Sequence, residues 1–298
     1  MTVSSTSFTQ KQLRATFQLG QGDFGESGFD IIAFSGLRMS ADVHLTNNHN
    51  MSAMQLRIWG LTFDHMQRLS VLKRPPISPG RKNKILLEAG DVETGLHKVY
   101  EGDINLAWAD YQNQPDVYFL VHSIGLLFAA VKPLPPVSYQ GAADVATVME
   151  GIAKSADCQF ENHGVDAKLS NPYFPGTARE QLRACADAAG IEWTYDRGTV
   201  AIWPAKKARG GEDKVPILTP TSGNIGYAAF TEFGIAMRCL YDPALKIGGL
   251  VEIRDSDIPN VNGRWKVWEL AYNLESEMPG GNWMMSFQGH YIQAGAAL

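Results

Sequence analysis

Alternation of apolar and polar residues at every second position constrains the fold of this chain more than any other feature. Segment 13–19 (LRATFQL) sets four apolar residues against three polar ones, and segment 37–45 (LRMSADVHL) sets five against four. Successive side chains of a strand point to opposite faces of a sheet, so this period predicts strands with one solvated face. The pattern continues at 54–60, 84–90, 98–104 and 117–124, with a short helix expected near 62–71. Many short strands separated by turn residues predict a β-barrel or sandwich over residues 1–132.

The longest nearly apolar run, from Val117 to Val131, is interrupted by His122 and Ser123. It is also shorter than the roughly 20 residues that a membrane-spanning helix needs. We interpret it as two buried strands joined at Gly125. The N-terminal residues contain no apolar core of the kind found in secretory signals, so we expect neither membrane insertion nor secretion.

The period changes to a helical one over residues 133–204. Segments 143–157 and 177–190 each place their apolar residues on one helical stripe, and Thr177 with Glu180 forms the sequence pattern of a capping box. A shift of 33 residues superimposes the two helices and the strand that follows each of them, which predicts an internal repeat of helix, strand, turn and strand. Two copies are too few for a solenoid, so we expect a compact α/β domain with pseudo-twofold symmetry.

A charged linker is predicted at 205–214, and the strand pattern returns over 215–298. Two long strand-like segments, 263–276 and 282–292, flank the turn residues EMPGG and predict a β-hairpin.

The first of these two long strands carries bulky residues on both faces. We assign Trp265, Val267 and Glu269 to one face, and we assign Lys266, Trp268 and Leu270 to the other. A strand covered on both sides is typical of a barrel whose outer wall is also buried, here by another subunit.

The polar residues show no catalytic, cofactor-binding or metal-binding pattern. Three cysteines and seven histidines are scattered without metal-site spacing (Cys158, Cys185, Cys239; His44, His49, His65, His97, His122, His163, His290). The glycine-rich segments 20–25 and 223–226 lack the strand and helix context of a phosphate loop. Glu275 and Glu277 share one predicted strand rather than a cleft. We therefore expect no enzyme activity, no cofactor and no bound metal.

The charge balance also limits the partners. A formal net charge of −5 gives no overall attraction to nucleic acid or to an anionic membrane. The one basic cluster, Lys73–Lys84, is interleaved with prolines rather than aromatic residues, so we expect a surface loop, or alternatively a contact to an acidic neighbour.

The last third of the chain resembles the C-terminal portion of baseplate hub proteins from contractile-tailed bacteriophages. The resemblance lies in a Thr-Pro pair, a Gly-hydrophobic-Gly segment, an Arg-x-Leu strand, a turn before a Gly-hydrophobic strand, and the hairpin with Trp283. The earlier segments MQLRIWGLTFDHMQRLS and ILLEAGD…VYEGDINLAW are similar to the N-terminal barrel of the same family. Together these segments span most of the chain.

The resemblance implies two tail-tube-type β-barrels, 1–132 and 215–298, flanking the α/β insert. It implies a homotrimer whose six barrels form a ring of near-sixfold order between the tail tube and a threefold spike. The lumen would pass the tape-measure protein and the DNA. The implied partners are the tail tube protein, the central spike protein and other baseplate proteins. The implied location is the virion tail baseplate, after assembly in the cytoplasm of the bacterial host.

A candidate interface lies in the glycine-rich, weakly charged stretch 221–249. We predict that the loop Ser222–Gly234 is ordered by contact with a second chain or with the tail tube, and the alternative is a loop folded over its own barrel. The candidate interface residues are Gly223, Gly226, Tyr227, Phe230 and Phe233. Glycines allow close backbone approach, and aromatic residues dominate many interfaces.

Three other functions remain open at this point. Another tube-fold tail component, such as a tube initiator or a distal tail protein, would form a sixfold ring with one barrel per chain. A β-rich hydrolase of cell-wall glycan would need an acid pair in a cleft. A carbohydrate-binding adhesin would expose aromatic residues on a rigid surface as a monomer.

Overall fold

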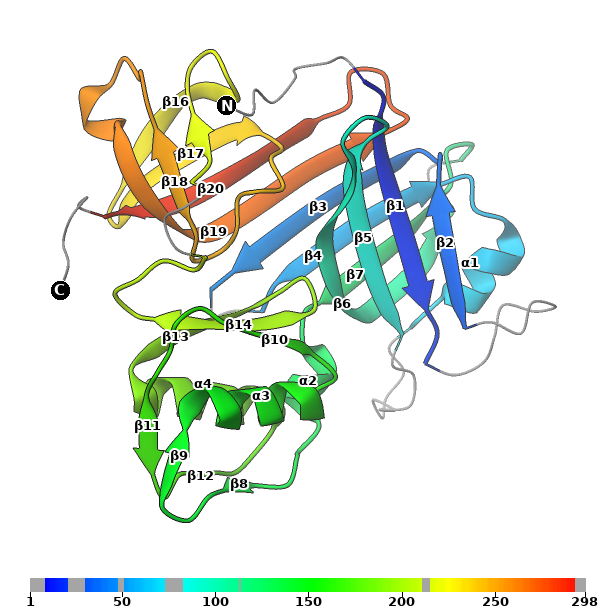
Figure 1. Cartoon of the computed structure of the whole chain (residues 1–298). Helices are drawn as coiled ribbons and strands as arrows, with labels where there is room; N and C mark the ends of the chain where they lie inside the picture. Colours follow the sequence, from blue (N-terminus) through cyan, green and yellow to red (C-terminus); the bar gives the residue numbers. More distant parts are fainter. Residues whose placement is uncertain are drawn as a thin grey trace.

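A computed structural model describes residues 9–20, 30–47, 51–72, 83–112, 114–210 and 215–292. Figure 1 shows a large twisted sheet that runs through the N-terminal and C-terminal parts of the chain, with a small α/β domain attached along one side. The chain is therefore mainly β with an α/β insert, as its residue periods predict.

The N-terminal part supplies seven strands and two short helices. The strands are β1 (Lys11–Gln18), β2 (Ile31–Ser35), β3 (Met39–Thr46), β4 (Ala53–Trp59), β5 (Lys84–Asp91), β6 (Gly95–Asp110) and β7 (Tyr118–Ile124). The helices are α1 (Phe63–Leu69), which Thr62 caps, and α2 (Leu127–Val131). Burial alternates along β1 from Gln12 onward, along β3 from Ala41 onward and along the whole of β4, which confirms that period two marks strands with one buried face.

The C-terminal part supplies six strands and one turn of 3-10 helix. These are β15 (Ile217–Leu218), β16 (Asn224–Thr231), β17 (Gly234–Leu240), β18 (Leu250–Ile253), η2 (Pro259–Val261), β19 (Gly263–Ser276) and β20 (Trp283–Tyr291). The predicted hairpin is confirmed, because β19 and β20 pair antiparallel on either side of the EMPGG turn.

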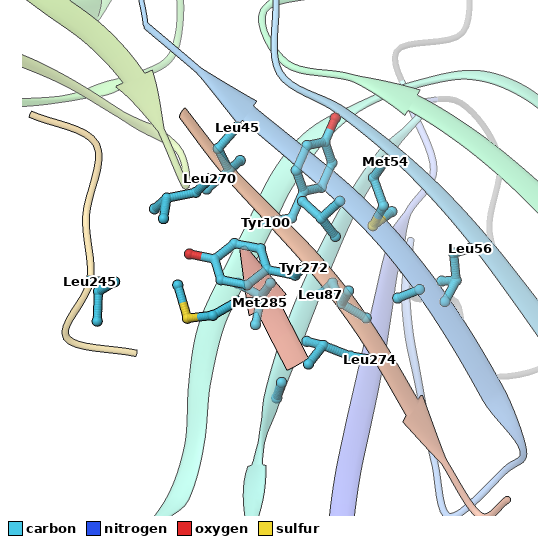
Figure 2. Close-up of a cluster of buried hydrophobic side chains, with 14 of the residues drawn as sticks. Leu45, Met54, Leu56, Leu87, Tyr100, Leu245, Leu270, Tyr272, Leu274 and Met285 are labelled. Carbon is cyan, nitrogen blue, oxygen red and sulfur yellow. The ribbon is translucent and has the colours of Figure 1, made fainter. Parts of the chain in front are cut away.

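The two β regions share one sheet and one core. One edge of β19 pairs with β18 near its start and with β3 over Glu269–Ser276, so the hydrogen-bonded path runs β16-β17-β20-β19-β3-β4-β7-β6-β5-β1-β2. Side chains of both regions meet in one cluster, where Leu45 and Tyr100 lie with Leu270 and Tyr272 (Figure 2). The predicted separation into two barrels is not confirmed: the described strands form one continuous sheet whose path does not close on itself.

The insert consists of two helices and several short strands. Its elements are β8 (Val137–Ser138), β9 (Ala142–Asp144), α3 (Val145–Ser155), β10 (Gln159–Asn162), β11 (Lys168–Ser170), β12 (Tyr173–Phe174), α4 (Ala178–Ala189), β13 (Ile191–Asp196) and β14 (Thr199–Pro204). The capping box of Thr177 and Glu180 forms as predicted, and Gly190 ends α4 in the left-handed conformation.

The two predicted copies of the repeat agree in their helices and differ in their strands. The apolar stripes of α3 and α4 are buried in one cluster. β13 and β14 form an antiparallel hairpin, whereas β10 pairs in parallel with β14 and β11 pairs with β9. The pseudo-twofold symmetry thus stays a prediction.

Two local assignments are wrong. The second half of the run Val117–Val131 is the helix α2, because Leu126 adopts a left-handed φ of 57° and Asp103 accepts from the Phe128 N–H at 3.0 Å. A short apolar run does not distinguish a buried strand from a helix.

The faces assigned along the long strand are also wrong. A register shift between Val267 and Glu269 places a β-bulge at Trp268. The extra residue reverses the alternation, so Trp265 and Val267 face the core together with Leu270.

Two further predictions concern charged segments. Residues 73–82 of the basic cluster lie outside the described residues, whereas Lys84 belongs to β5 and its Nζ lies 2.5 Å from Asp157 Oδ2. Residues 211–214 of the predicted linker also lie outside the described residues, and Arg209, within its described part, is buried and paired with Asp196 of the insert.

Candidate assembly interface

The segment predicted as a loop, Ser222–Gly234, contains an edge strand. β16 pairs with β17 on one side and, within the described residues, with no strand on the other. The two strands join through a tight turn at Glu232 and Phe233. The loop assignment is therefore corrected: glycines near Asn224 interrupt the strand pattern in the sequence but not the strand itself.

The two candidate glycines determine the backbone conformation of this edge strand. Gly223 and Gly226 adopt φ values of +96° and +72°, which other residues rarely adopt. Gly226 lies where the register of β16 against β17 shifts, between Ile225 and Ala229. It therefore permits a bulge, a usual device at sheet edges.

The three candidate aromatic residues are exposed. Tyr227, Phe230 and Phe233 keep 71%, 59% and 64% of their surface accessible. Phe230 lies directly opposite Ile235, which is fully buried, so the Phe230 ring extends the core side of the sheet into solvent. We call Tyr227, Phe230 and Phe233 the edge patch.

The edge patch continues into a row of ring contacts. The Phe233 ring packs edge-on against His290 at 6.4 Å, and His290 in turn stacks on Trp268 at 5.7 Å. His290 Nδ1 lies 2.6 Å from the Phe233 carbonyl oxygen, and the Tyr227 hydroxyl donates to Asp257 at 3.4 Å. These contacts hold the aromatic residues in place without covering them.

β16 lacks the usual protection of an edge strand. None of its eight residues is charged and none is proline, although native edges are normally protected by such residues. The bulge disrupts only the first half of β16, because residues 229–231 pair regularly with β17. The second half of β16 therefore has a regular edge that another strand could pair with. An uncharged edge with exposed aromatic rings is the surface that a protein partner would cover.

The sheet face opposite the core carries a row of polar residues. Asn273, Asp42, Gln55 and His122 are directly paired across β19, β3, β4 and β7, so their side chains form one row on that face. Burial, together with the positive charge of Arg57, lowers the pKa of His122, which therefore favours the neutral form. A groove of about 330 Å³ on this face is lined by residues that include Asp42, His44, Arg238 and Asn282.

The insert is fixed to the sheet by a cluster of buried charges that sequence reasoning missed. Arg209 donates to Asp196 at 2.7 Å and to Glu161 at 3.1 Å, and Arg197 Nε lies 3.3 Å from Asp196. Arg197 also donates to the Tyr272 hydroxyl at 2.8 Å. The turn residues Asp196-Arg197-Gly198 were visible in the sequence, but nothing in their spacing indicated these partners.

The electrostatics of this cluster favour ionised groups. Burial opposes the charge on Asp196, but Arg197 and Arg209 outweigh it, so the pKa of Asp196 lies below its ordinary value. Burial also opposes the charge on Arg197, and the neighbouring Tyr272 and Asp196 overcome this effect and raise its pKa. The cluster therefore connects the hairpin β13–β14 to β19 and stabilises the position of the insert.

The other polar residues considered in the sequence, Glu275 and Glu277, do not form a common site. Glu275 accepts from Ser40 and from the Asn282 N–H, while Glu277 accepts from Gln10, so each carboxylate has its own structural partner. Among the described residues, no group of three or more His, Cys, Asp or Glu side chains could hold a metal ion. No helix in the described part of the chain is long and apolar enough to span a membrane.

Comparison with solved structures shows the same fold in tail proteins. A 43 kDa tail protein of prophage MuSo2 from Shewanella oneidensis matches with a TM-score of 0.60 and 11% identity, over 93% of this chain and 96% of that one. A tail protein from Neisseria meningitidis MC58 matches with a TM-score of 0.61, 11% identity and the same coverage. A chain of the half-lidded Francisella PdpA–VgrG complex matches with a TM-score of 0.53 and 6% identity, over 95% of this chain and 58% of that one.

Sequence comparison identifies the family. No curated protein matches this chain. The model of the family described as baseplate hub gp41 matches residues 12–279, which is most of the sequence. The chain therefore belongs to the baseplate hub gp41 family.

Proposed function

We propose that this protein is the structural hub of a contractile phage tail baseplate. Its family membership shows a structural role in a phage tail baseplate. The finer proposal is a ring of three copies, in which the two β regions of each copy give near-sixfold order. Such a ring joins the sixfold tail tube to a threefold spike and acts without enzyme activity.

The observation that carries the proposal is the uncharged, aromatic edge of β16. Each residue of the edge patch keeps more than half of its surface exposed, and such a surface is unusual in a protein that acts as a monomer. Contact with a second chain would bury these rings and cover an unpaired strand edge. Gly223 and Gly226 shape the backbone for that contact.

The polar face of the sheet is suited to line the channel. The row Asn273, Asp42, Gln55 and His122 offers hydrogen-bonding groups and no unpaired cation, since Arg57 lies beside Asp42 at 3.6 Å. DNA binding strengthens with each lysine or arginine that contacts a phosphate. A row without an unpaired cation would therefore let the tape-measure protein and the DNA pass without being held, although the exposed Arg238 lies in the groove beside this row.

The proposed partners follow from this position in the baseplate. They are sister copies, the tail tube protein, the central spike protein and other baseplate proteins. The fold-related Francisella chain was solved within a complex of PdpA with VgrG, which shows that this fold occurs in a hetero-assembly there. We place the protein in the virion tail, after assembly in the cytoplasm of the host.

A single substitution tests the role of the edge patch. Phe230→Asp places a charge where the ring would be desolvated by a partner, so we expect assembled rings to be lost in sizing columns and negative-stain images. Val92→Asp is the matched control, because Val92 is also an exposed apolar residue (67%) but lies in the β5–β6 turn. If Phe230→Asp forms the same rings as the wild-type protein, β16 is not part of the assembly interface.

A further inference from the structure

A small polar cavity lies at the junction of the insert and the large sheet. Its volume is about 20 Å³, and the residues that line it include Thr46, Ser52, Arg179, Trp193 and Tyr195. Thr46 ends β3 and Ser52 precedes β4, so these two residues belong to the sheet. Trp193 and Tyr195 come from β13, a strand of the insert that lies on the side of its helices facing the sheet (Figure 1). The cavity therefore borders both parts of the molecule.

Trp193 brings a buried hydrogen-bond donor to this cavity. The residue keeps only 2% of its surface accessible, and its indole Nε1 has no hydrogen-bond acceptor among the described residues. Two other buried indoles do have acceptors: Trp203 donates to Glu192 at 3.0 Å, and Trp265 donates to the Val261 carbonyl at 2.8 Å. A buried donor without an acceptor costs free energy, so such groups in native proteins bond to protein atoms or to ordered water. The Trp193 N–H therefore needs an acceptor that its protein neighbours do not supply.

The size of the cavity limits the ligand to a very small molecule. One water molecule needs a cavity of roughly 10–15 Å³, so a volume of about 20 Å³ has room for one. Pockets for cofactors and other small organic molecules measure about 300 Å³ or more. The cavity therefore admits a water molecule and excludes organic ligands.

The polarity of the lining residues favours water over a dry cavity. Cavities lined by apolar side chains alone stay dry, whereas a buried water has two to four polar partners. Thr46, Ser52 and Tyr195 each carry a hydroxyl group. Burial raises the pKa of Tyr195 well above its ordinary value, so the Tyr195 hydroxyl keeps its proton and can both donate and accept.

We propose that this cavity binds one ordered water molecule, which accepts from the Trp193 indole N–H and bonds to at least one hydroxyl group of the other lining residues. This water links β13 to the sheet beside a direct contact, in which the Thr194 hydroxyl donates to the Thr46 carbonyl at 3.3 Å. Asp196, at the end of the same strand, belongs to the cluster of buried charges. Polar contacts thus hold β13 along its length.

A crystal structure of the wild-type protein at a resolution that shows ordered water tests the site directly. We expect one density peak about 2.9 Å from Trp193 Nε1, with a second contact to Thr46, Ser52 or Tyr195. If no peak lies within hydrogen-bonding distance of this nitrogen, or if the indole donates to a protein atom instead, the proposal is wrong.

NMR of the protein with isotope-labelled tryptophan tests the site in solution. Trp193→Phe assigns the Trp193 indole signal through its loss, and Trp265→Phe does the same for the matched control. We expect cross-relaxation between water and the Trp193 indole proton, and none for Trp265, whose indole donates to a backbone carbonyl. If the two indole signals behave alike, the proposal is wrong. The proposed function survives this failure, because the cavity lies within one chain and does not depend on the ring.

Discussion

Arg197 lies where the insert meets the sheet. Its φ of 56° is unusual for a residue with a side chain, and such strain persists only where surrounding contacts hold it. Here Asp196, Tyr272 and the Leu245 carbonyl surround the guanidinium. A Cβ on the next residue, Gly198, would overlap the carboxylate of Glu101. The turn therefore touches both β regions at once.

Asp196→Asn should destabilise the protein strongly. The change leaves Arg197 and Arg209 buried without their shared carboxylate, and breaking a buried pair in this way costs about 3–5 kcal/mol. Urea unfolding at one fixed protein concentration measures the loss. Asp187→Asn is the control: its pairing with Arg183 at 3.6 Å is exposed, so we expect a change of less than about 0.5 kcal/mol. An equal loss of unfolding free energy in the two variants would show that the buried charge cluster does not stabilise the protein more than an exposed ion pair does.

The contribution of Asp196 to the free energy of unfolding should also depend on pH. Its pKa is lowered in the folded state, so its stabilising contribution is complete above the unfolded value of about 4 and is lost as pH falls toward the folded value. We therefore expect the stability difference between wild type and Asp196→Asn to be constant above about pH 5 and to shrink below about pH 4. A difference that grows on acidification would contradict this assignment.

None of these buried charges was predicted from the sequence, for a physical reason. Arg197 and Tyr272 lie 75 positions apart, and their meeting depends on how the insert docks on the sheet. Residue type and local spacing carry no information about such a contact. The sequence predicted Phe230 and Phe233 as interface residues because apolar residues in a weakly charged, glycine-rich segment are unusual; the structure shows that both are exposed, and their role in an interface stays a prediction.

At the scale of elements, strands with one wet face were predictable and irregular ones were not. β1, β3 and β4 follow strict period two and were found at nearly their observed bounds. β16 was missed because Gly223, Gly226 and its bulge disturb the pattern. The faces of β19 were reversed because one bulged residue, Trp268, changes the register of every residue after it.

Gly248 tests how closely the insert and the C-terminal loops pack. Gly248 has a φ of +78°, and a Cβ there would overlap the fully buried Trp203 ring of β14. Gly248→Ala should cost about 1–2 kcal/mol of backbone strain and about 1–3 kcal/mol more for the overlap. Gly280→Ala is the matched control, because Gly280 has a φ of +69° with open space around its Cβ position, and it should show the strain alone. Thermal unfolding compares the two, and equal shifts would mean that Trp203 can move aside.

At the scale of the whole molecule, the order of β, α/β and β segments was predictable because each has its own period. The pairing of the two β regions in one sheet was not predictable. β3 and β19 pair across more than 200 positions, as the 2.6 Å hydrogen bond from Asn273 to Asp42 illustrates, and local patterns do not encode such pairing. One shared sheet and one shared core join the two β regions, which favours a ring built from whole chains rather than from independent barrels.

The number of copies in the native particle tests the central claim most directly. Native mass spectrometry of the assembled wild-type protein should give three copies of the 32.7 kDa chain. A particle of six copies would instead indicate a tube component, and a stable monomer would indicate a protein that acts alone. Either result would contradict the hub.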